Sequence, residues 1–174
     1  MKHFDEIYEI AADNYGIVTT AQARELGVSK SELNRWVDIG RLERRGRGVY
    51  KLVMYTPTDL DPYAEAVALV GDDSFLLGET VLAMHGLALA NPRKLTIGTP
   101  KRIRKALPSW IEAVTVFDKD TTRYEGIPSQ TVPEAILDCR GRVLAERLRD
   151  ASDAARKSGL ITKSEHQRLK EELS

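Results

Sequence analysis

The first forty residues contain three short segments whose hydrophobic residues have helical spacing. At the start of the chain, apolar side chains recur at i, i+3, i+4 and i+7, namely Phe4, Ile7, Tyr8 and Ala11. This period predicts an amphipathic helix over 3–14. Two shorter helices are expected over 21–26 and 30–39, because Thr19 and Ser29 stand just before them and a hydroxyl there caps the first turn.

Two short strands are predicted after the third helix. Leu33, Trp36 and Val37 share one face of that helix, so we expect Trp36 to be a core residue. The segments 42–45 and 49–52 flank the sequence Gly-Arg-Gly, a pattern typical of a β-hairpin. Helix, helix, turn, helix and hairpin is the order of a winged helix-turn-helix domain.

Beyond a polar connector that contains two prolines, the pattern mixes helices and strands. The expected helices are 63–70 and 79–85, and the expected strands are 75–77, 95–97, 113–117 and 127–132. The fold class is therefore predicted to be α+β. An N-terminal winged helix-turn-helix domain over 1–55 is expected to be followed by an α+β domain over 56–174, which ends in a helical region.

The helical C-terminal region is predicted from a second apolar stripe. Its members, at helical spacing after Pro133, are Leu144, Leu148, Ala151 and Ala155. A last helix is expected after Thr162, because Glu165 follows at the spacing of a capping box. Leu169 and Leu173 would face inward from it.

The charge of the chain is segmented, although its 26 basic and 26 acidic residues give a formal net charge of zero. Residues 30–51 hold seven Lys or Arg against three acids, residues 52–92 hold six acids and no base, and residues 93–105 hold six bases and no acid. The distribution of charge is therefore more informative about partners than the total is.

The first basic segment coincides with the predicted winged helix. In such a domain the second helix of the helix-turn-helix enters the major groove of DNA, and the wing lies along the phosphates. Lys, Arg and Asn side chains on that helix can contact base edges. The predicted DNA-binding residues are Lys30, Ser31, Asn34 and Arg35 on the helix, and Arg44, Arg45 and Arg47 around the hairpin tip. Solubility is the alternative role for each of these charges taken alone.

A second basic patch flanks the predicted strand at 95–97. Its residues are Arg93, Lys94, Lys101, Arg102, Arg104 and Lys105. This patch could contact phosphates or an acidic partner protein, or it could be a solvated loop balanced by the acidic stretch before it.

The sequence offers little catalytic chemistry. Many metal-dependent nucleases use an acid followed two residues later by Lys, and this chain has no such pair. His3, His85 and His166 are isolated, and Cys139 is the one cysteine, so no metal site and no cofactor are expected. Cys139 is expected to be a buried hydrophobe, and His85 to be partly buried rather than catalytic. We therefore expect a protein that is not an enzyme.

The cellular location can also be anticipated. No apolar run approaches the roughly 18–20 residues of a membrane span, and the first residues do not resemble a signal peptide. A single cysteine is compatible with a reducing compartment. A cytoplasmic protein with no membrane partner is expected.

The segment GIVTTAQARELGVSKSELNRWVDIGRLERRGRGVYKL resembles the N-terminal winged helix of the AbiEi family, the antitoxins of type IV toxin–antitoxin systems. The similarity lies in the Thr19-Thr20 helix start, Gly27-Val28-Ser29, Leu33, Gly40-Arg41-Leu42 and Arg47-Gly48-Val49-Tyr50. Later, GIPSQTVPEAILDC and GLITKSEHQRL are similar to the C-terminal part of that family.

The resemblance implies two activities. The winged helix would bind double-stranded operator DNA at inverted repeats, where two copies can pair, and repress the protein's own operon. The C-terminal domain would counteract a nucleotidyltransferase-type toxin, with or without direct contact. Two alternatives remain open at this stage, namely a stand-alone transcriptional regulator without a toxin and a DNA-directed nuclease.

Overall fold

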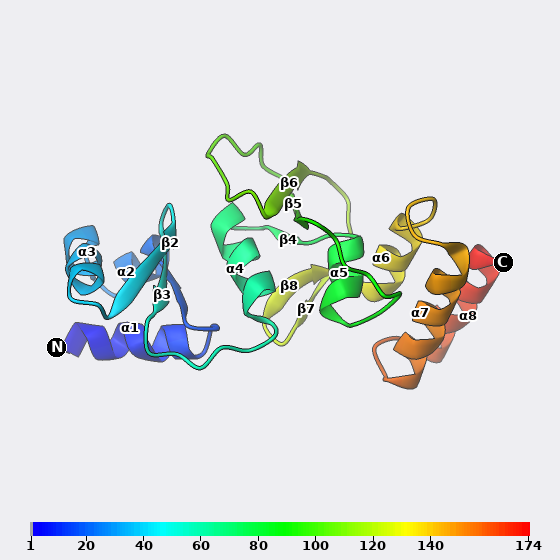
Figure 1. The fold of residues 1–174 in the computed structure, drawn as a ribbon, viewed down its shortest axis with the longest axis horizontal. Helices are drawn as coiled ribbons and strands as arrows, with labels where there is room; N and C mark the ends of the chain where they lie inside the picture. Colours follow the sequence, from blue (N-terminus) through cyan, green and yellow to red (C-terminus); the bar gives the residue numbers. More distant parts are fainter. Residues whose placement is uncertain (1) are drawn as a thin grey trace. The chain divides into compact units, whose positions relative to one another are not determined.

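The computed structural model describes residues 2–174, which separate into two compact units (Figure 1). Unit 1 contains the described residues up to Asp72 together with Ala106–Pro108, and unit 2 contains Asp73–Lys105 and Ser109–Ser174. The fold class is α+β, as predicted, with a winged helix at the N-terminus and helices at the C-terminus. The predicted domain boundary after residue 55 stays a prediction.

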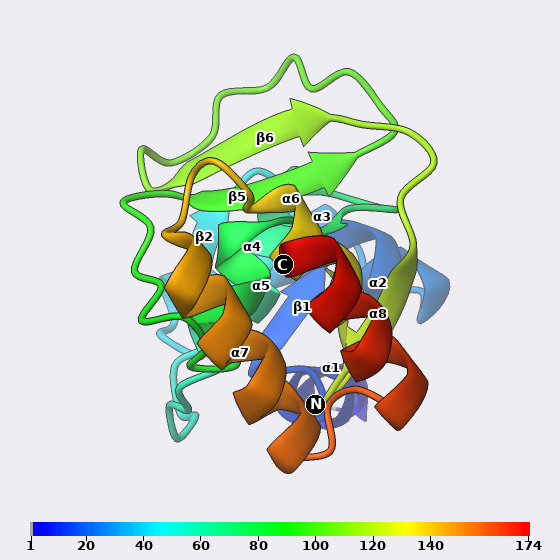
Figure 2. The ribbon, with the colours of Figure 1, turned by 90° about the vertical axis from the view of Figure 1, so that its right-hand side faces the viewer.

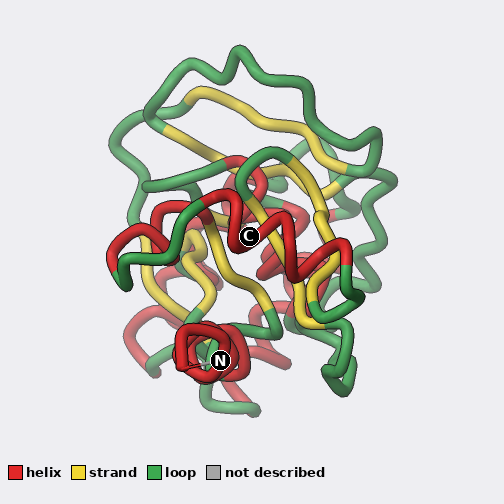
Figure 3. The backbone as a smooth tube through the Cα atoms, turned by 90° about the vertical axis from the view of Figure 1, so that its left-hand side faces the viewer, coloured by secondary structure: helices red, strands yellow, loops and turns green. Residues whose placement is uncertain are grey.

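Unit 1 is a winged helix with one additional helix. Its elements are α1 (Lys2–Ala12), β1 (Ile17–Thr19), α2 (Thr20–Glu25), α3 (Lys30–Asp38), β2 (Leu42–Gly46), β3 (Val49–Leu52) and α4 (Asp61–Val70). The strands form an antiparallel sheet in the order β1-β3-β2. The three helices and the hairpin confirm the sequence prediction. Figure 3 shows this unit with α1 seen end-on at the N-terminus.

Of the two short helices of the helix-turn-helix, α3 begins at its predicted residue and α2 begins one residue earlier than predicted. Thr19 Oγ1 accepts a hydrogen bond from Gln22 N at 3.2 Å, and Gln22 Oε1 accepts one from Thr19 N at 2.9 Å. Ser29 Oγ accepts a hydrogen bond from Glu32 N at 3.1 Å. These contacts satisfy backbone N–H groups that the first helical turn leaves without partners. Local chemistry thus fixes where α2 and α3 start.

The core of unit 1 surrounds α3. Leu33 is fully buried and Trp36 is 2 % exposed. The ring of Trp36 contacts Phe4 of α1 edge-on, with 5.3 Å between the ring centroids. Ile7 of α1 and Leu42 of β2 belong to the same apolar cluster. The prediction that Trp36 is a core residue is therefore confirmed.

Unit 2 is a mixed five-stranded sheet with helices. Its elements are β4 (Phe75–Leu76), α5 (Glu79–Met84), β5 (Leu95–Thr99), β6 (Ile111–Thr115), β7 (Thr121–Tyr124), β8 (Ile127–Gln130), α6 (Val132–Asp138), α7 (Ala145–Lys157) and α8 (Lys163–Leu173). The strand order is β6-β5-β4-β8-β7. The pairs β5/β6 and β4/β8 are parallel, and the pairs β4/β5 and β7/β8 are antiparallel.

The last two helices form an antiparallel hairpin that packs on α6 (Figure 2). The capping box at Thr162 and Glu165 is confirmed, since each residue accepts a hydrogen bond from the backbone N–H of the other. Leu148 and Leu169 are buried as expected. Leu144 corrects the predicted stripe, because it lies at the N-cap of α7 with its side chain 62 % exposed. Within residues 2–174, no helix is both long and apolar enough to cross a lipid bilayer.

Candidate nucleic-acid interface

Helix α3 has one buried face and one polar face. Leu33 and Trp36 are buried and Val37 is partly buried against the same cluster. The predicted DNA-binding residues of this helix are all exposed, namely Lys30, Ser31, Asn34 and Arg35. Because the core side chains fix the rotation of the helix, the polar face keeps a defined direction relative to the hairpin. Such a face can contact base edges in a major groove.

The β2–β3 hairpin, called the wing from here on, carries the three predicted arginines. Arg44, Arg45 and Arg47 are all exposed. Gly48 at the turn has a φ of +74°, a left-handed conformation that glycine adopts without a steric penalty. The carbonyl oxygen of Gly48 accepts a hydrogen bond from Thr20 N at 2.9 Å, which ties the wing to the start of α2.

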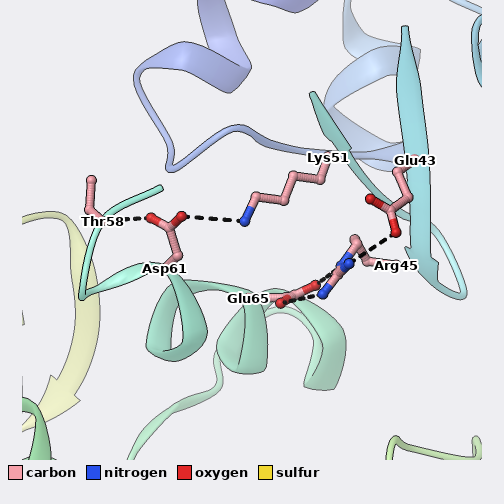
Figure 4. A network of polar contacts seen from close by, with 6 residues as sticks. All are labelled: Glu43, Arg45, Lys51, Thr58, Asp61 and Glu65. Atoms are coloured by element: carbon pink, nitrogen blue, oxygen red, sulfur yellow. Dashed lines mark hydrogen bonds and ion pairs between the residues drawn. The ribbon is translucent and has the colours of Figure 1, made fainter. Parts of the chain in front are cut away.

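The third predicted arginine, Arg45, turns toward α4 (Figure 4). Its guanidinium forms a two-pronged ion pair with Glu65, in which Nη2 donates to Oε2 at 3.3 Å and Nε donates to Oε1. It also contacts Glu43 Oε1 at 3.1 Å. The hydrogen bond to Glu65 raises the pKa of Arg45. The structure therefore separates Arg45 from Arg44 and Arg47, because its charge is compensated within unit 1.

A second ion pair joins the same two elements. Lys51 Nζ of β3 lies 3.3 Å from Asp61 Oδ2 of α4, and Asp61 Oδ1 accepts a hydrogen bond from Thr58 Oγ1 at 2.6 Å. Asp61 and Glu65 stand four residues apart on one helix, and each is only 5 % exposed. Buried carboxylates require such partners, since an unpaired charge away from water is costly. The two pairs hold the wing against α4 (Figure 4).

The wing and α4 also meet through apolar contact. A Cβ atom added to Gly46 would overlap the side chain of Leu69. Gly46 thus allows the close approach that brings Arg45 to Glu65. Sequence reasoning missed this support, although the i, i+4 spacing of Asp61 and Glu65 behind a basic hairpin was an available signal.

The second basic patch is divided by a strand. Arg93 and Lys94 precede β5, whereas the run 101–105 follows it. A five-residue strand separates its two ends by roughly 16 Å. Lys101 Nζ lies 3.4 Å from Asp73 Oδ2 in an exposed ion pair. The two groups of bases therefore lie at opposite ends of one strand.

The groups considered for chemistry have environments suited to structural roles. Cys139 is buried, and burial raises its pKa to about 11, so its thiol stays protonated at neutral pH. His85 is partly buried, as predicted, and contacts Tyr124 edge-on with 4.4 Å between ring centroids. Burial lowers the pKa of His85, which favours the neutral imidazole. Within residues 2–174, no three His, Cys, Asp or Glu side chains are grouped as a metal site.

Residues 5–53 match the family described as "Transcriptional regulator, AbiEi antitoxin". The match extends from α1 to the end of the wing, which is less than a third of the chain. It confirms, for this segment, the family resemblance predicted from the sequence. The resemblance of the C-terminal part lies outside the matched residues and stays a prediction.

Two further comparisons concern the whole chain. No curated protein matches it significantly. Among solved structures it is similar to the RV2827C protein from Mycobacterium tuberculosis, with 16 % sequence identity and a TM-score of 0.49 over 97 % of this chain and 71 % of that chain.

Proposed function

We propose that this protein is an autoregulating antitoxin whose winged helix binds operator DNA upstream of its own gene. In this proposal α3 contacts base edges and the wing contacts phosphates, with two copies pairing on an inverted repeat in the cytoplasm. The observation that carries the proposal is the exposure of Lys30, Asn34 and Arg35 on α3 beside Arg44 and Arg47 on the wing. The family match over 5–53 supports a regulator of this kind.

For the C-terminal part we propose that it counteracts a nucleotidyltransferase-type toxin. The support is the description of the matched family as an antitoxin, together with the sequence resemblance after Gly126. Expression of the full chain should restore growth to cells that express a nucleotidyltransferase encoded beside its gene. The Arg44→Ala/Arg47→Ala variant should rescue growth equally, since the toxin would be opposed through unit 2. Failure of the full chain to rescue would favour a stand-alone transcriptional regulator.

Asn34→Ala or Arg35→Ala should each weaken binding to the operator by about 1–3 kcal/mol, which is roughly 5- to 150-fold in Kd. A side chain that forms two hydrogen bonds to a base edge loses both on truncation. The loss on a scrambled duplex should be smaller, because phosphate contacts are independent of sequence. Fluorescence anisotropy with both duplexes at low and near-physiological salt measures the two values.

Lys157→Ala is the matched control, since Lys157 is exposed on α7 and plays no part in the proposed interface. Its affinity for both duplexes should equal that of the unmodified protein. Equal losses on operator and scrambled DNA in the α3 variants would contradict base contact by α3. Binding to both duplexes that disappears together at physiological salt would contradict operator recognition as a whole.

A further inference from the structure

Two loops with complementary chemistry begin at the same end of the unit 2 sheet. Strands β5 and β6 are parallel and paired in register from Leu95↔Ile111 to Thr99↔Thr115, so their carboxyl ends coincide (Figure 2). The basic run 101–105 follows β5 after Pro100, and Phe117 follows β6. Hydrogen bonds join the loops where they leave the sheet, from Val116 N to Thr99 O at 2.9 Å and from Thr115 Oγ1 to Lys101 O at 3.4 Å. The basic run therefore starts beside the aromatic residue.

A groove of about 820 Å³ lies at this end of the sheet, and we call it the sheet-end groove. It is lined by the start of β4, the segments that follow β5 and β6, and strand β7, including Ser74, Pro100, Phe117, Lys119, Thr122 and Arg123. Ligands commonly bind at the carboxyl ends of parallel strands, because the loops there converge. The groove is thus placed where a ligand site is expected, and the winged helix contributes none of its lining.

Phe117 is the most informative lining residue. Its side chain is 68 % exposed, whereas large aromatic side chains usually bury most of their surface. An exposed ring at the edge of a groove offers a flat apolar face on which another planar ring can stack. Each stacked base contributes about 1–3 kcal/mol in proteins that bind single strands.

The charges around Phe117 suit a polyanion. Lys101 and Arg102 are exposed in the loop after Pro100, and Arg123 is exposed on β7. Arg123 Nη1 donates to Gly126 O at 3.1 Å, which uses one of the five N–H donors of a guanidinium. Two acids also line the groove, and one of them, Asp73, pairs with Lys101. Both side chains of this pair are exposed, so the pair is weak and a phosphate can replace the carboxylate. The second acid that lines the groove is Asp118, which follows Phe117 in the chain. Exposed hydroxyls of Thr121 and Thr122 add neutral hydrogen-bonding groups.

We propose that the sheet-end groove binds an unpaired nucleic acid strand, with a base stacked on Phe117. Phosphates would be contacted by Arg123 in the groove and by Lys101 and Arg102, which follow the lining residue Pro100. A single strand fits this chemistry better than a duplex, whose bases are already stacked and paired and cannot cover the ring. Nucleic acid also fits better than an acidic protein, because an exposed aromatic ring among cations and hydroxyls is matched by a chain that alternates planar bases with phosphates. This site is separate from the duplex-binding surface proposed for α3 and the wing.

The test is fluorescence anisotropy of the full chain with labelled 12-nucleotide oligo(U) and oligo(dT), which form no duplex. Phe117→Ala should raise Kd at least tenfold without altering thermal unfolding, since the side chain is exposed. Lys101→Ala/Arg102→Ala should weaken binding and reduce the salt slope, by about 0.7 for each lost phosphate contact. The Kd values of the two oligomers, compared at one salt concentration, show whether the groove prefers RNA or DNA.

Three controls make the result specific. Arg93→Ala/Lys94→Ala removes the same charge at the opposite end of β5 and should leave Kd unchanged. Leu144→Ala removes another exposed apolar side chain of unit 2 and should also have no effect. Arg44→Ala/Arg47→Ala should weaken duplex binding and leave oligomer binding intact, which separates this site from the proposed operator contact. The proposal is overturned if the protein does not bind the oligomers, or if Phe117→Ala binds them normally. Equal losses in the two lysine–arginine variants would also overturn it, because they would indicate general attraction by charge.

Discussion

Trp36→Ala should lower the free energy of unfolding of unit 1 by about 3–5 kcal/mol. Trp36 is among the largest fully buried side chains of the chain, and it packs edge-on against Phe4. Its removal leaves a cavity between α1 and α3 that the surrounding helices can fill only in part. Because α3 carries the residues proposed to contact bases, operator affinity should fall together with stability.

The measurement must report on each unit separately, since two-state unfolding is typical of single small domains. Hydrogen exchange followed by mass spectrometry in increasing urea resolves the amides of residues 2–72 from those of unit 2. The variant should expose unit 1 amides at lower urea, while the amides of α6, α7 and α8 should exchange as before.

Trp36→Phe is the informative control. Trp36 Nε1 is a buried donor for which no partner exists among the described residues. Phenylalanine keeps one aromatic ring and loses the rest of the fused ring system together with this unsatisfied N–H, so the cost should stay well below that of the alanine variant. A phenylalanine variant as unstable as the alanine variant would show that the indole N–H has a partner. It would contradict an account based on packing.

Unit 1 could be predicted closely because local signals specify its elements. Thr19 and Ser29 each cap the helix that follows by contacts within three residues. The rotation of α3 follows from the spacing of Leu33 and Trp36. The strand β1 was missed, because three residues are too few to show an alternation of apolar and polar positions. Its partner strand β3 also lies far along the chain, with Ile17 paired to Lys51.

The elements missed in unit 2 depend on contacts between distant segments. Strand β7 has the sequence TTRY with three exposed residues in succession, so no alternation of apolar and polar residues marks it. Its antiparallel pairing with β8 is what makes this segment a strand. Leu144 fits the apolar period of α7 but lies at the N-cap, where the helical geometry has not yet begun. The position of Phe117 beside the basic run required the parallel pairing of β5 with β6, which no local pattern specifies.

The residues of the proposed interface were named from the sequence, and the structure distinguishes one of them, Arg45, from the others. Arg44, Arg45 and Arg47 are equivalent by composition and spacing, and only the tertiary structure distinguishes them. The partner of Arg45 is Glu65, which lies 20 residues away on a helix that the sequence did not associate with the wing. The acidic charge after residue 52 therefore has a specific structural role at two positions, Asp61 and Glu65.

Arg45→Ala should destabilise unit 1 by about 2–3 kcal/mol and leave the salt slope of DNA binding unchanged. Removing one partner of a buried ion pair costs about 3–5 kcal/mol. The lower value is expected because the Arg45 side chain is 34 % exposed, although that of Glu65 is only 7 % exposed. The affected carboxylate is Glu65, which would stay buried without its cation. Urea unfolding followed by Trp36 fluorescence, in a Trp110→Phe background, reports unit 1 alone.

Arg44→Ala and Arg47→Ala form the opposite comparison. Neither guanidinium is held by α4, so each substitution should change stability by less than about 0.5 kcal/mol. Each should instead reduce the salt slope of duplex binding by about 0.9, as expected for one lost phosphate contact.

Glu65→Ala together with Arg45→Ala should recover part of the stability lost in Arg45→Ala, because no unpaired carboxylate remains buried. If Arg45→Ala reduced the slope as Arg44→Ala does, Arg45 would leave Glu65 to contact DNA. The wing would then bind phosphates with three arginines, and Glu65 would compete with DNA for one of them.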